Sequence, residues 1–200
     1  MTGRIVILNG APRSGKSSIA RALQASLPGH WINLGVDAQN RSLPEALGPG
    51  IGLRPGGERP DLEPVVERLY LALYASIAAH AGQGFDVVVD VGHHDGYSRP
   101  LGILPQCARL LAGFDVLFVG VHCPIEVIMD RRNAAPLGYL AGPGVPEPVQ
   151  RWQDAVHVPG VYDLEVDTGT MAPEDCVAAI AMALADPSTR AALARLAATS

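Results

Sequence analysis

The stretch Gly10-Ala11-Pro12-Arg13-Ser14-Gly15-Lys16-Ser17 decides the fold of this chain. It matches the pattern G-x-x-x-x-G-K-[ST] in full. It follows the β-branched run Arg4 to Asn9 and opens a segment, Ser17 to Leu27, with apolar residues at helical spacing. This strand–turn–helix context is the one in which the pattern forms a phosphate-binding loop. A glycine-rich turn without function is the alternative interpretation.

Each part of this loop has a physical role in binding a triphosphate. Backbone N–H groups between Gly10 and Ser18 wrap the β-phosphate, and the helix N-terminus adds positive potential. Lys16 reaches the β- and γ-phosphate oxygens, and Ser17 Oγ is a ligand for Mg²⁺. Lys16 is also the only lysine among fifteen Lys and Arg residues. Either codon bias favours arginine, or lysine was kept where the planar arginine fork fits poorly. The loop predicts ATP and Mg²⁺ as cofactors.

Strands and helices alternate along the rest of the chain. Besides Arg4 to Asn9, the sequence predicts strands at Trp31 to Val36, Phe85 to Val91, Asp115 to Val121 and Tyr162 to Val166. Predicted helices between and after them are Leu62 to Ala81, Pro105 to Leu111, Glu126 to Arg132, Val149 to Val156 and Pro173 to Ala185. Such alternation is typical of an α/β layered domain, here with a five-stranded parallel sheet.

The composition argues against several classes of protein. Of the 200 residues, 48% are hydrophobic, enough for the core of one domain spanning residues 1–200. The net charge of −5 and the lack of basic runs argue against nucleic acid or a membrane surface as partner. No apolar run approaches the roughly 18 residues of a membrane span. Cys107, Cys123 and Cys176 form no CxxC pair, which favours a reducing cytoplasm over disulfides or zinc. The oligomeric state is left open.

Ligands of a parallel sheet bind beyond the carboxyl ends of its strands. Asp90 follows Val87-Val88-Val89, the position from which a Walker B carboxylate holds Mg²⁺ or its water; the alternative is an aspartate that caps a turn. Asp37 ends the second predicted strand. A carboxylate there could accept the proton of an acceptor hydroxyl and orient it for in-line attack. A helix N-cap or turn aspartate is the alternative, and position alone leaves both open.

Further candidates lie in or near a lid that we place at approximately residues 131–157. Arg131 and Arg132 precede a segment rich in glycine and proline, and arginines there would neutralise charge on the transferring phosphoryl group. An arginine pair on a solvated helix face is the alternative.

His93 and His94 lack the spacing of a metal site, so we expect them in a loop that lines the acceptor pocket. His157 is either a lid or hinge residue or a turn histidine.

Several segments together resemble the chloramphenicol phosphotransferase-like family of small P-loop kinases. In family order they are Ile7-Leu8-Asn9-Gly10 running into Gly15-Lys16-Ser17, Gly35-Val36-Asp37, Val88-Val89-Asp90, Asp115 to Val121, Val156-His157, Gly160-Val161-Tyr162-Asp163, and Glu165-Val166-Asp167-Thr168. The resemblance implies a three-layer P-loop kinase fold and ATP-dependent phosphorylation of a hydroxyl on a small molecule. In the namesake enzyme this is the primary alcohol of chloramphenicol, which inactivates the antibiotic. The family's catalytic base falls on Asp37.

The acceptor side departs from the namesake. Residues 41–60 and 92–105, expected to line the acceptor pocket, do not follow it, and Pro136 to Pro148 of the lid is unusually rich in glycine and proline. Another antibiotic or hydroxylated metabolite therefore suits the same machinery. Two rival functions remain: a primary-metabolite kinase of the shikimate or gluconate type, and a nucleotide-binding regulatory or toxin-like protein without a small-molecule substrate.

Overall fold

A computed structural model describes residues 2–134 and 144–199 of the chain. Five strands form one sheet: β1 (Ile5–Asn9), β2 (Trp31–Asn33), β3 (Asp86–Val91), β4 (Val116–His122) and β5 (Leu164–Asp167). They lie in the order β2-β3-β1-β4-β5, and every pairing is parallel. The prediction of a five-stranded parallel sheet is therefore confirmed.

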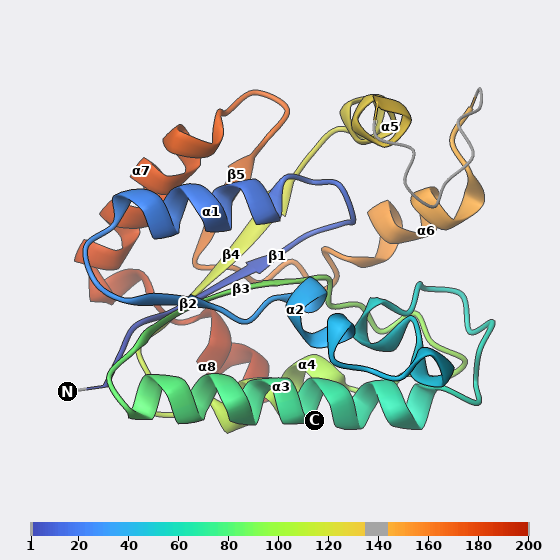
Figure 1. Cartoon of the computed structure of the whole chain (residues 1–200), viewed down its shortest axis with the longest axis horizontal. Coiled ribbons are helices and arrows are strands. Elements are labelled where there is room, and N and C mark those ends of the chain that lie inside the picture. The colour runs from blue at the N-terminus through green and yellow to red at the C-terminus, as the bar shows by residue number, and fades with distance from the viewer. Residues whose placement is uncertain (1, 135–143, 200) are drawn as a thin grey trace.

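Helices cover both faces of the sheet. They are α1 (Lys16–Ser26), α2 (Val36–Arg41), α3 (Glu63–Gly82), α4 (Ile103–Leu110), α5 (Ile125–Ala134), α6 (Glu147–Ala155), α7 (Pro173–Ala185) and α8 (Ala192–Ala197). Short 3-10 turns are η1 (Glu45–Leu47), η2 (Gly50–Gly52) and η3 (Pro187–Thr189). Helices α1 and α7 lie over one face and α3, α4 and α8 over the other, which gives three layers (Figure 1).

The alternation of side chains along each strand divides the core in two. In β1, Ile5 and Ile7 pack with the helices α3, α4 and α8, whereas Val6 and Leu8 pack with α1 and α7. All four side chains are fully buried. Since β1 is the middle strand and apolar on both sides, its carboxyl end is held rigidly between two packed layers. The loop that follows it therefore starts from a fixed point.

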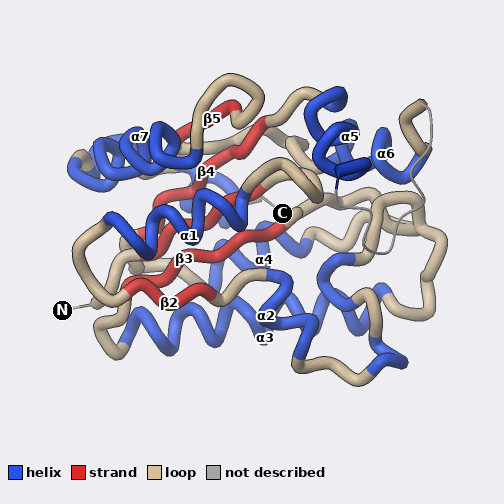
Figure 2. The backbone as a smooth tube through the Cα atoms, turned by 45° about the horizontal axis from the view of Figure 1, so that its top comes forward, coloured by secondary structure: helices blue, strands red, loops and turns tan. Residues whose placement is uncertain are grey.

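The elements at the carboxyl ends of the strands build the functional edge of the molecule. The loop after β1, helix α2 after β2, and helices α5 and α6 after β4 all gather on this side, and Figure 2 shows the same grouping from a second direction. A small apolar cluster joins Ala11 of the loop to α5 and α6 through Ile128 and Trp152. Of the predicted lid, residues 135–143 lie outside the described residues.

Strand β2 is shorter than predicted. The sequence predicts a strand from Trp31 to Val36, but β2 ends at Asn33 and α2 begins at Val36. Asn33 Oδ1 accepts a hydrogen bond from the Gly35 N–H at 3.0 Å, which turns the chain out of the sheet. Asp37 is consequently in the first turn of a helix rather than at the end of a strand.

Within residues 2–134 and 144–199 no single helix combines the length and apolar character needed to cross a membrane. Pro173–Ala185 and Pro187–Ala197 meet the criterion only as a pair bent by 95°.

Candidate functional site

The P-loop, residues Gly10–Ser17, joins β1 to α1 through an unusual backbone. Arg13 and Gly15 both have left-handed conformations, with φ of 68° and 93°. Gly15 is the residue before the first turn of α1, where the free N–H groups of a helix begin. A side chain at position 15 would also crowd Arg131, whose Nη1 lies 3.3 Å from where a Cβ would stand. Glycine thus keeps the helix N-terminus open to a ligand.

Lys16 is held inside the P-loop. Its Nζ donates hydrogen bonds to the carbonyl oxygens of Gly10, at 2.8 Å, and Ala11, at 2.7 Å. Burial lowers the pKa of this ammonium from its ordinary value of 10.5 to about 8, although the charges of Asp90 and Asp37 oppose the effect. A buried cation with two neutral acceptors lacks full compensation, so an anion placed beside Nζ would be attracted strongly.

Ser17 and Asp90 bring two oxygen groups together beside Lys16. Ser17 Oγ donates to Asp90 Oδ2 at 2.6 Å, and Asp90 as a residue is 7% exposed. Room for it comes from Gly35, because a Cβ at that position would overlap Asp90 Oδ1. The sequence segments Gly35-Val36-Asp37 and Val88-Val89-Asp90 are therefore linked physically: one supplies the space that the other fills.

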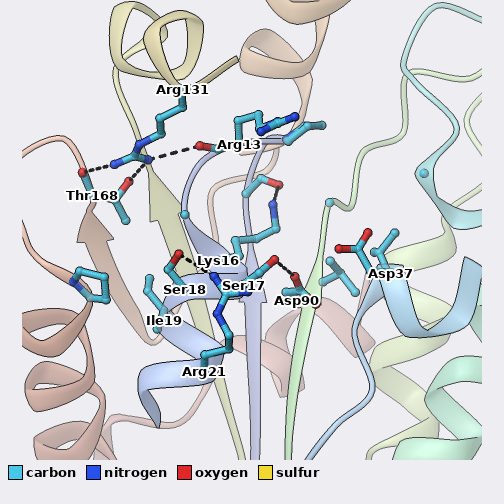
Figure 3. A pocket seen from close by; sticks show the side chains of 18 of the residues that line it. Arg13, Lys16, Ser17, Ser18, Ile19, Arg21, Asp37, Asp90, Arg131 and Thr168 are labelled. Carbon is cyan, nitrogen blue, oxygen red and sulfur yellow. Dashed lines mark hydrogen bonds between the residues drawn. The ribbon is translucent and has the colours of Figure 1, made fainter. Parts of the chain in front are cut away.

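These groups line one cleft of about 660 Å³. Figure 3 shows Lys16, Ser17 and Asp90 at its middle, with Asp37 on one side and Thr168 and Arg131 on the other. Asp37 is exposed and reaches the cleft from α2, which faces the P-loop. The cleft therefore offers three zones: a cationic loop, a carboxylate across from it, and a far end formed by the loop after β5 and the start of α7.

Arg131 lies over the P-loop. Its Nη1 donates to the Arg13 carbonyl oxygen at 3.2 Å and to Thr168 Oγ1 at 3.1 Å, and its Nη2 donates to the Thr168 carbonyl oxygen at 2.8 Å. Thr168 Oγ1 in turn donates to the Ser14 carbonyl oxygen at 2.7 Å. Arg131 thus joins α5, the P-loop and the loop after β5, with its guanidinium at the wall of the cleft.

Arg132 does not share this position. It lines a neighbouring cavity rather than the cleft, so the structure separates the two arginines that the sequence places together. Two residues of the predicted loop, Ala11 and Ser14, do not line the cleft. Ala11 lines that second cavity, and Ser14 has a buried hydroxyl for which the described residues provide no hydrogen-bond partner.

The adjacent histidines His93 and His94 are buried and form ring contacts and hydrogen bonds within the fold. His93 is buried, stacks on Tyr70 with ring centroids 4.4 Å apart, and bonds Tyr74 Oη through Nε2 at 2.8 Å. Burial lowers its pKa to about 3, so the ring is neutral. His94 Nε2 bonds the Leu53 carbonyl oxygen at 2.8 Å. The described residues contain no cluster suited to a metal ion, and neither ring lines the cleft.

His157 lies just after α6 and contacts Tyr162 and His122. Its Nδ1 bonds Tyr162 Oη at 2.8 Å, and its ring stacks on His122 with centroids 4.0 Å apart. Burial, followed by the nearby His122 and Lys16, lowers the pKa of His157 to about 4. His157 thus fixes the end of α6 against the segment before β5.

Sequence reasoning missed two residues. Asn9 Nδ2 donates to the Val156 carbonyl oxygen and to Tyr162 Oη, both at 2.9 Å, and its Oδ1 accepts from the His93 N–H at 2.7 Å. This amide fixes the start of the P-loop to two distant segments. Trp152 of α6 lines both the cleft and the second cavity. Asparagine before the motif was a visible signal, but nothing in the sequence marks Trp152.

Comparison with known proteins identifies the family and the fold of this chain. The model of the family described as chloramphenicol phosphotransferase-like proteins matches residues 3–185. The chain belongs to this family. A search of curated proteins gave no match.

Solved structures related to this chloramphenicol phosphotransferase-like chain share its fold at low sequence identity. The APS kinase of Mycobacterium tuberculosis, solved in complex with AMPPNP and APS, has 19% identity and a TM-score of 0.65, covering 92% of this chain and 99% of its own. Shikimate kinase from Acinetobacter baumannii with shikimate has 16% identity and a TM-score of 0.58, covering 90% and 92%. The tunicamycin resistance protein of Deinococcus radiodurans has 19% identity and a TM-score of 0.57, covering 90% and 94%. The three-layer P-loop kinase fold is thereby confirmed, and family and fold together support a small-molecule kinase.

Proposed function

We propose that this protein is an ATP-dependent O-phosphotransferase that phosphorylates a hydroxyl group of a small molecule. One observation carries the proposal: a single cleft contains the buried ammonium of Lys16, the Ser17–Asp90 oxygen pair and, across from them, the carboxylate of Asp37. The first two suit a triphosphate. The third is a proton acceptor on the side from which an alcohol would approach.

The proposed transfer reaction uses this arrangement. The acceptor oxygen attacks the γ-phosphorus of ATP, its proton passes to Asp37, and the bond from the γ-phosphorus to the β–γ bridging oxygen breaks to release ADP. Lys16 Nζ exchanges its carbonyl partners for phosphate oxygens and stabilises their charge. Arg131, at the wall of the cleft, adds a second cation for the equatorial oxygens.

The same cleft suits Mg²⁺. Asp90 presents a carboxylate that Ser17 Oγ approaches at 2.6 Å, and carboxylate, hydroxyl and water oxygens are the ligands this ion prefers. Ser17 and Asp90 would hold it with the ATP phosphates. When bound, Mg²⁺ reduces the negative charge on the β- and γ-phosphates.

For the acceptor we propose an antibiotic alcohol, with chloramphenicol as the first compound to examine. The family to which the chain belongs supports this choice. The rival functions are distinguished by turnover. A primary-metabolite kinase would release ADP with sugar or cyclitol acids instead, and a regulatory protein would bind ATP without any alcohol raising its turnover.

The base assignment predicts a specific effect of Asp37→Asn. The amide cannot accept the proton but nearly preserves shape, so we expect phosphoryl transfer to fall by about 10²–10⁴-fold. ATP affinity should stay within about twofold, because Asp37 lies across the cleft from the P-loop. Acceptor-dependent ADP release and ATP titration calorimetry measure the two quantities.

Asp130→Asn is the matched control. Asp130 is exposed on α5 and outside the cleft, so this variant should transfer phosphate at the wild-type rate. Wild-type transfer by Asp37→Asn would show that Asp37 is not the base. A large loss of ATP affinity in the same variant would assign Asp37 to the nucleotide side instead.

A further inference from the structure

A second cavity of about 610 Å³ adjoins the P-loop cleft. The two share Pro12, Arg13, Gly52 and Trp152 in their walls. A volume in this range is typical of sites for drug-sized ligands. A molecule that occupied the second cavity could thus extend past Gly52 into the cleft. There η2, which contains Gly52, packs against α2, the helix of Asp37.

Much of the wall is apolar. Besides the shared residues, the apolar lining consists of Ala11, Pro49, Leu53, Ile128, Pro148 and Val149. Trp152, a residue that is 8% exposed, contributes its indole. The indole is held by a T-shaped contact with the His94 ring, with centroids 4.9 Å apart, and by Gly92, where a Cβ would stand 3.0 Å from the indole. A fixed aromatic wall favours a flat apolar ligand, because little side-chain freedom is lost on binding.

The charged part of the wall is mainly cationic. Arg13, Arg54, Arg59 and Arg132 line the cavity, with Glu58 as the single acidic group among the described lining residues. Glu58 is engaged: it accepts from Arg54 Nε at 2.6 Å and from Arg151 Nη1 at 2.7 Å. Arg59 pairs with Asp61 at 2.7 Å. Even with Asp61 counted, four arginines stand against two acids, in a chain whose net charge is −5.

A local excess of arginine in an acidic protein selects for anions. Guanidinium groups bind carboxylates through two parallel hydrogen bonds, and a concave apolar surround strengthens the attraction. A small polar acid would leave the apolar wall in contact with water. A neutral aromatic alcohol would bring no anion to a wall in which arginines outnumber acidic groups. The wall as a whole suits a ligand that has both an apolar body and an anionic group.

We propose that this cavity holds the body of the acceptor, and that the acceptor is an alcohol with an aromatic or similarly flat apolar body and a carboxylate. The inference rests on the proposed function and narrows it. Among hydroxylated antibiotics, it favours acidic ones over neutral ones such as chloramphenicol. The carboxylate lies among the arginines, the ring lies along Trp152, and the hydroxyl points past Gly52 toward Asp37.

Three small alcohols test separately whether the ligand's ring and its carboxylate contribute to binding. The probe 4-(hydroxymethyl)benzoate carries ring, acid and hydroxyl; benzyl alcohol lacks the acid, and glycerate lacks the ring. Ligand-observed NMR titration of the full chain measures the three affinities without relying on turnover. We expect the first probe to bind at least about tenfold more tightly than either of the others. Equal affinities, or no binding of the first probe, would overturn the inference.

Variants of the cavity wall test whether the acidic probe binds in the second cavity. Arg132→Gln should weaken 4-(hydroxymethyl)benzoate by about tenfold and leave benzyl alcohol unchanged. Val149→Glu introduces a negative charge without removing an arginine and should have the same effect. Arg99→Gln, at an exposed arginine outside both cavities, should change neither affinity. An unchanged affinity for the acidic probe in both Arg132→Gln and Val149→Glu would place it elsewhere.

ADP release on the same samples separates this inference from the proposed function. Selective binding of the acidic probe without ADP release would support the cavity assignment and count against phosphoryl transfer to this class of alcohol. Efficient phosphorylation of neutral or ring-free alcohols, without binding of the acidic probe, would support the phosphotransferase and overturn the acceptor class.

Discussion

At the scale of single residues, the Lys16 ammonium that we propose binds ATP also loses its proton in an accessible pH range. Burial lowers its pKa to about 8, whereas the unfolded chain keeps the ordinary value of 10.5. Between these values the unfolded state binds more protons than the folded state. The ligand-free protein therefore gains stability as the pH rises through this window, and below pH 8 the full cost of burying the charge is present.

Nucleotide affinity should have the opposite dependence. ATP requires the charged form of Lys16, so its affinity should fall by about tenfold between pH 7.5 and pH 9 as the free protein loses this proton. Titration calorimetry at several pH values measures the slope. The variant Lys16→Arg stays charged throughout and should lack it. The same slope in Lys16→Arg would assign the titration to another group.

The sequence predicts which residues line the cleft where this depends on neighbours in the chain. The P-loop is eight consecutive residues, and Asp90 follows three valines. Asn9 is different, because its partners Val156 and Tyr162 lie 147 and 153 positions away. Arg132 shows the same limit: adjacent arginines on a helix point in different directions, so they reach different cavities.

At the scale of elements, the turn from β2 into α2 positions two acidic groups at once. Gly35 leaves space for Asp90, and the helix that starts directly after it carries Asp37. The sequence predicts strand β2 too long because Leu34 and Val36 extend its apolar pattern. The hydrogen bond from Gly35 to Asn33 that ends the strand depends on a side-chain orientation that periodicity does not reveal.

Gly35→Ala should displace the Asp90 carboxylate. A methyl group at position 35 overlaps Asp90 Oδ1, so the Ser17–Asp90 hydrogen bond should break, with about 1–3 kcal/mol lost from the free energy of unfolding. Chemical denaturation measures this loss. The Mg²⁺ concentration needed for half-maximal ADP release should rise in the same variant.

Gly82→Ala provides the control for that experiment. Gly82 is the last residue of α3, and a Cβ there meets no atom within 4 Å. Its substitution should leave both stability and the Mg²⁺ requirement within experimental error or slightly improved. If Gly35→Ala behaved like Gly82→Ala, the space at Gly35 would have no bearing on Asp90.

At the scale of the whole molecule, the parallel sheet brings the ends of β1, β2, β3 and β5 to one edge. Strand alternation and helix periodicity are enough to predict this, because they depend on local pattern alone. The shapes of the cleft and the second cavity depend on packing between α6, the P-loop and residues 49–59. Such packing joins segments far apart in sequence, so the sequence does not predict Trp152 as their shared wall.

Nucleotide binding should stabilise the whole fold. A non-hydrolysable ATP analogue with Mg²⁺ at about 100 times its Kd adds about 2.7 kcal/mol. For a chain of this length that corresponds to a rise in Tm of about 5–10 °C. Asp37→Asn should keep this rise and Lys16→Ala should lose most of it. Differential scanning calorimetry provides the test, and an unchanged Tm for the wild-type protein would contradict triphosphate binding at the P-loop.

The proposed phosphate site and the second cavity are built largely from different segments of the chain, and this matters for engineering. The groups proposed to bind phosphate come from α1, β3 and the loop after β1, whereas most of the second cavity's wall comes from residues 49–59, α5 and α6. Asn9 fastens the two parts at one buried amide. Libraries that randomise only the outer walls should therefore change which acceptor the proposed phosphotransferase uses, while its phosphate donor stays the same.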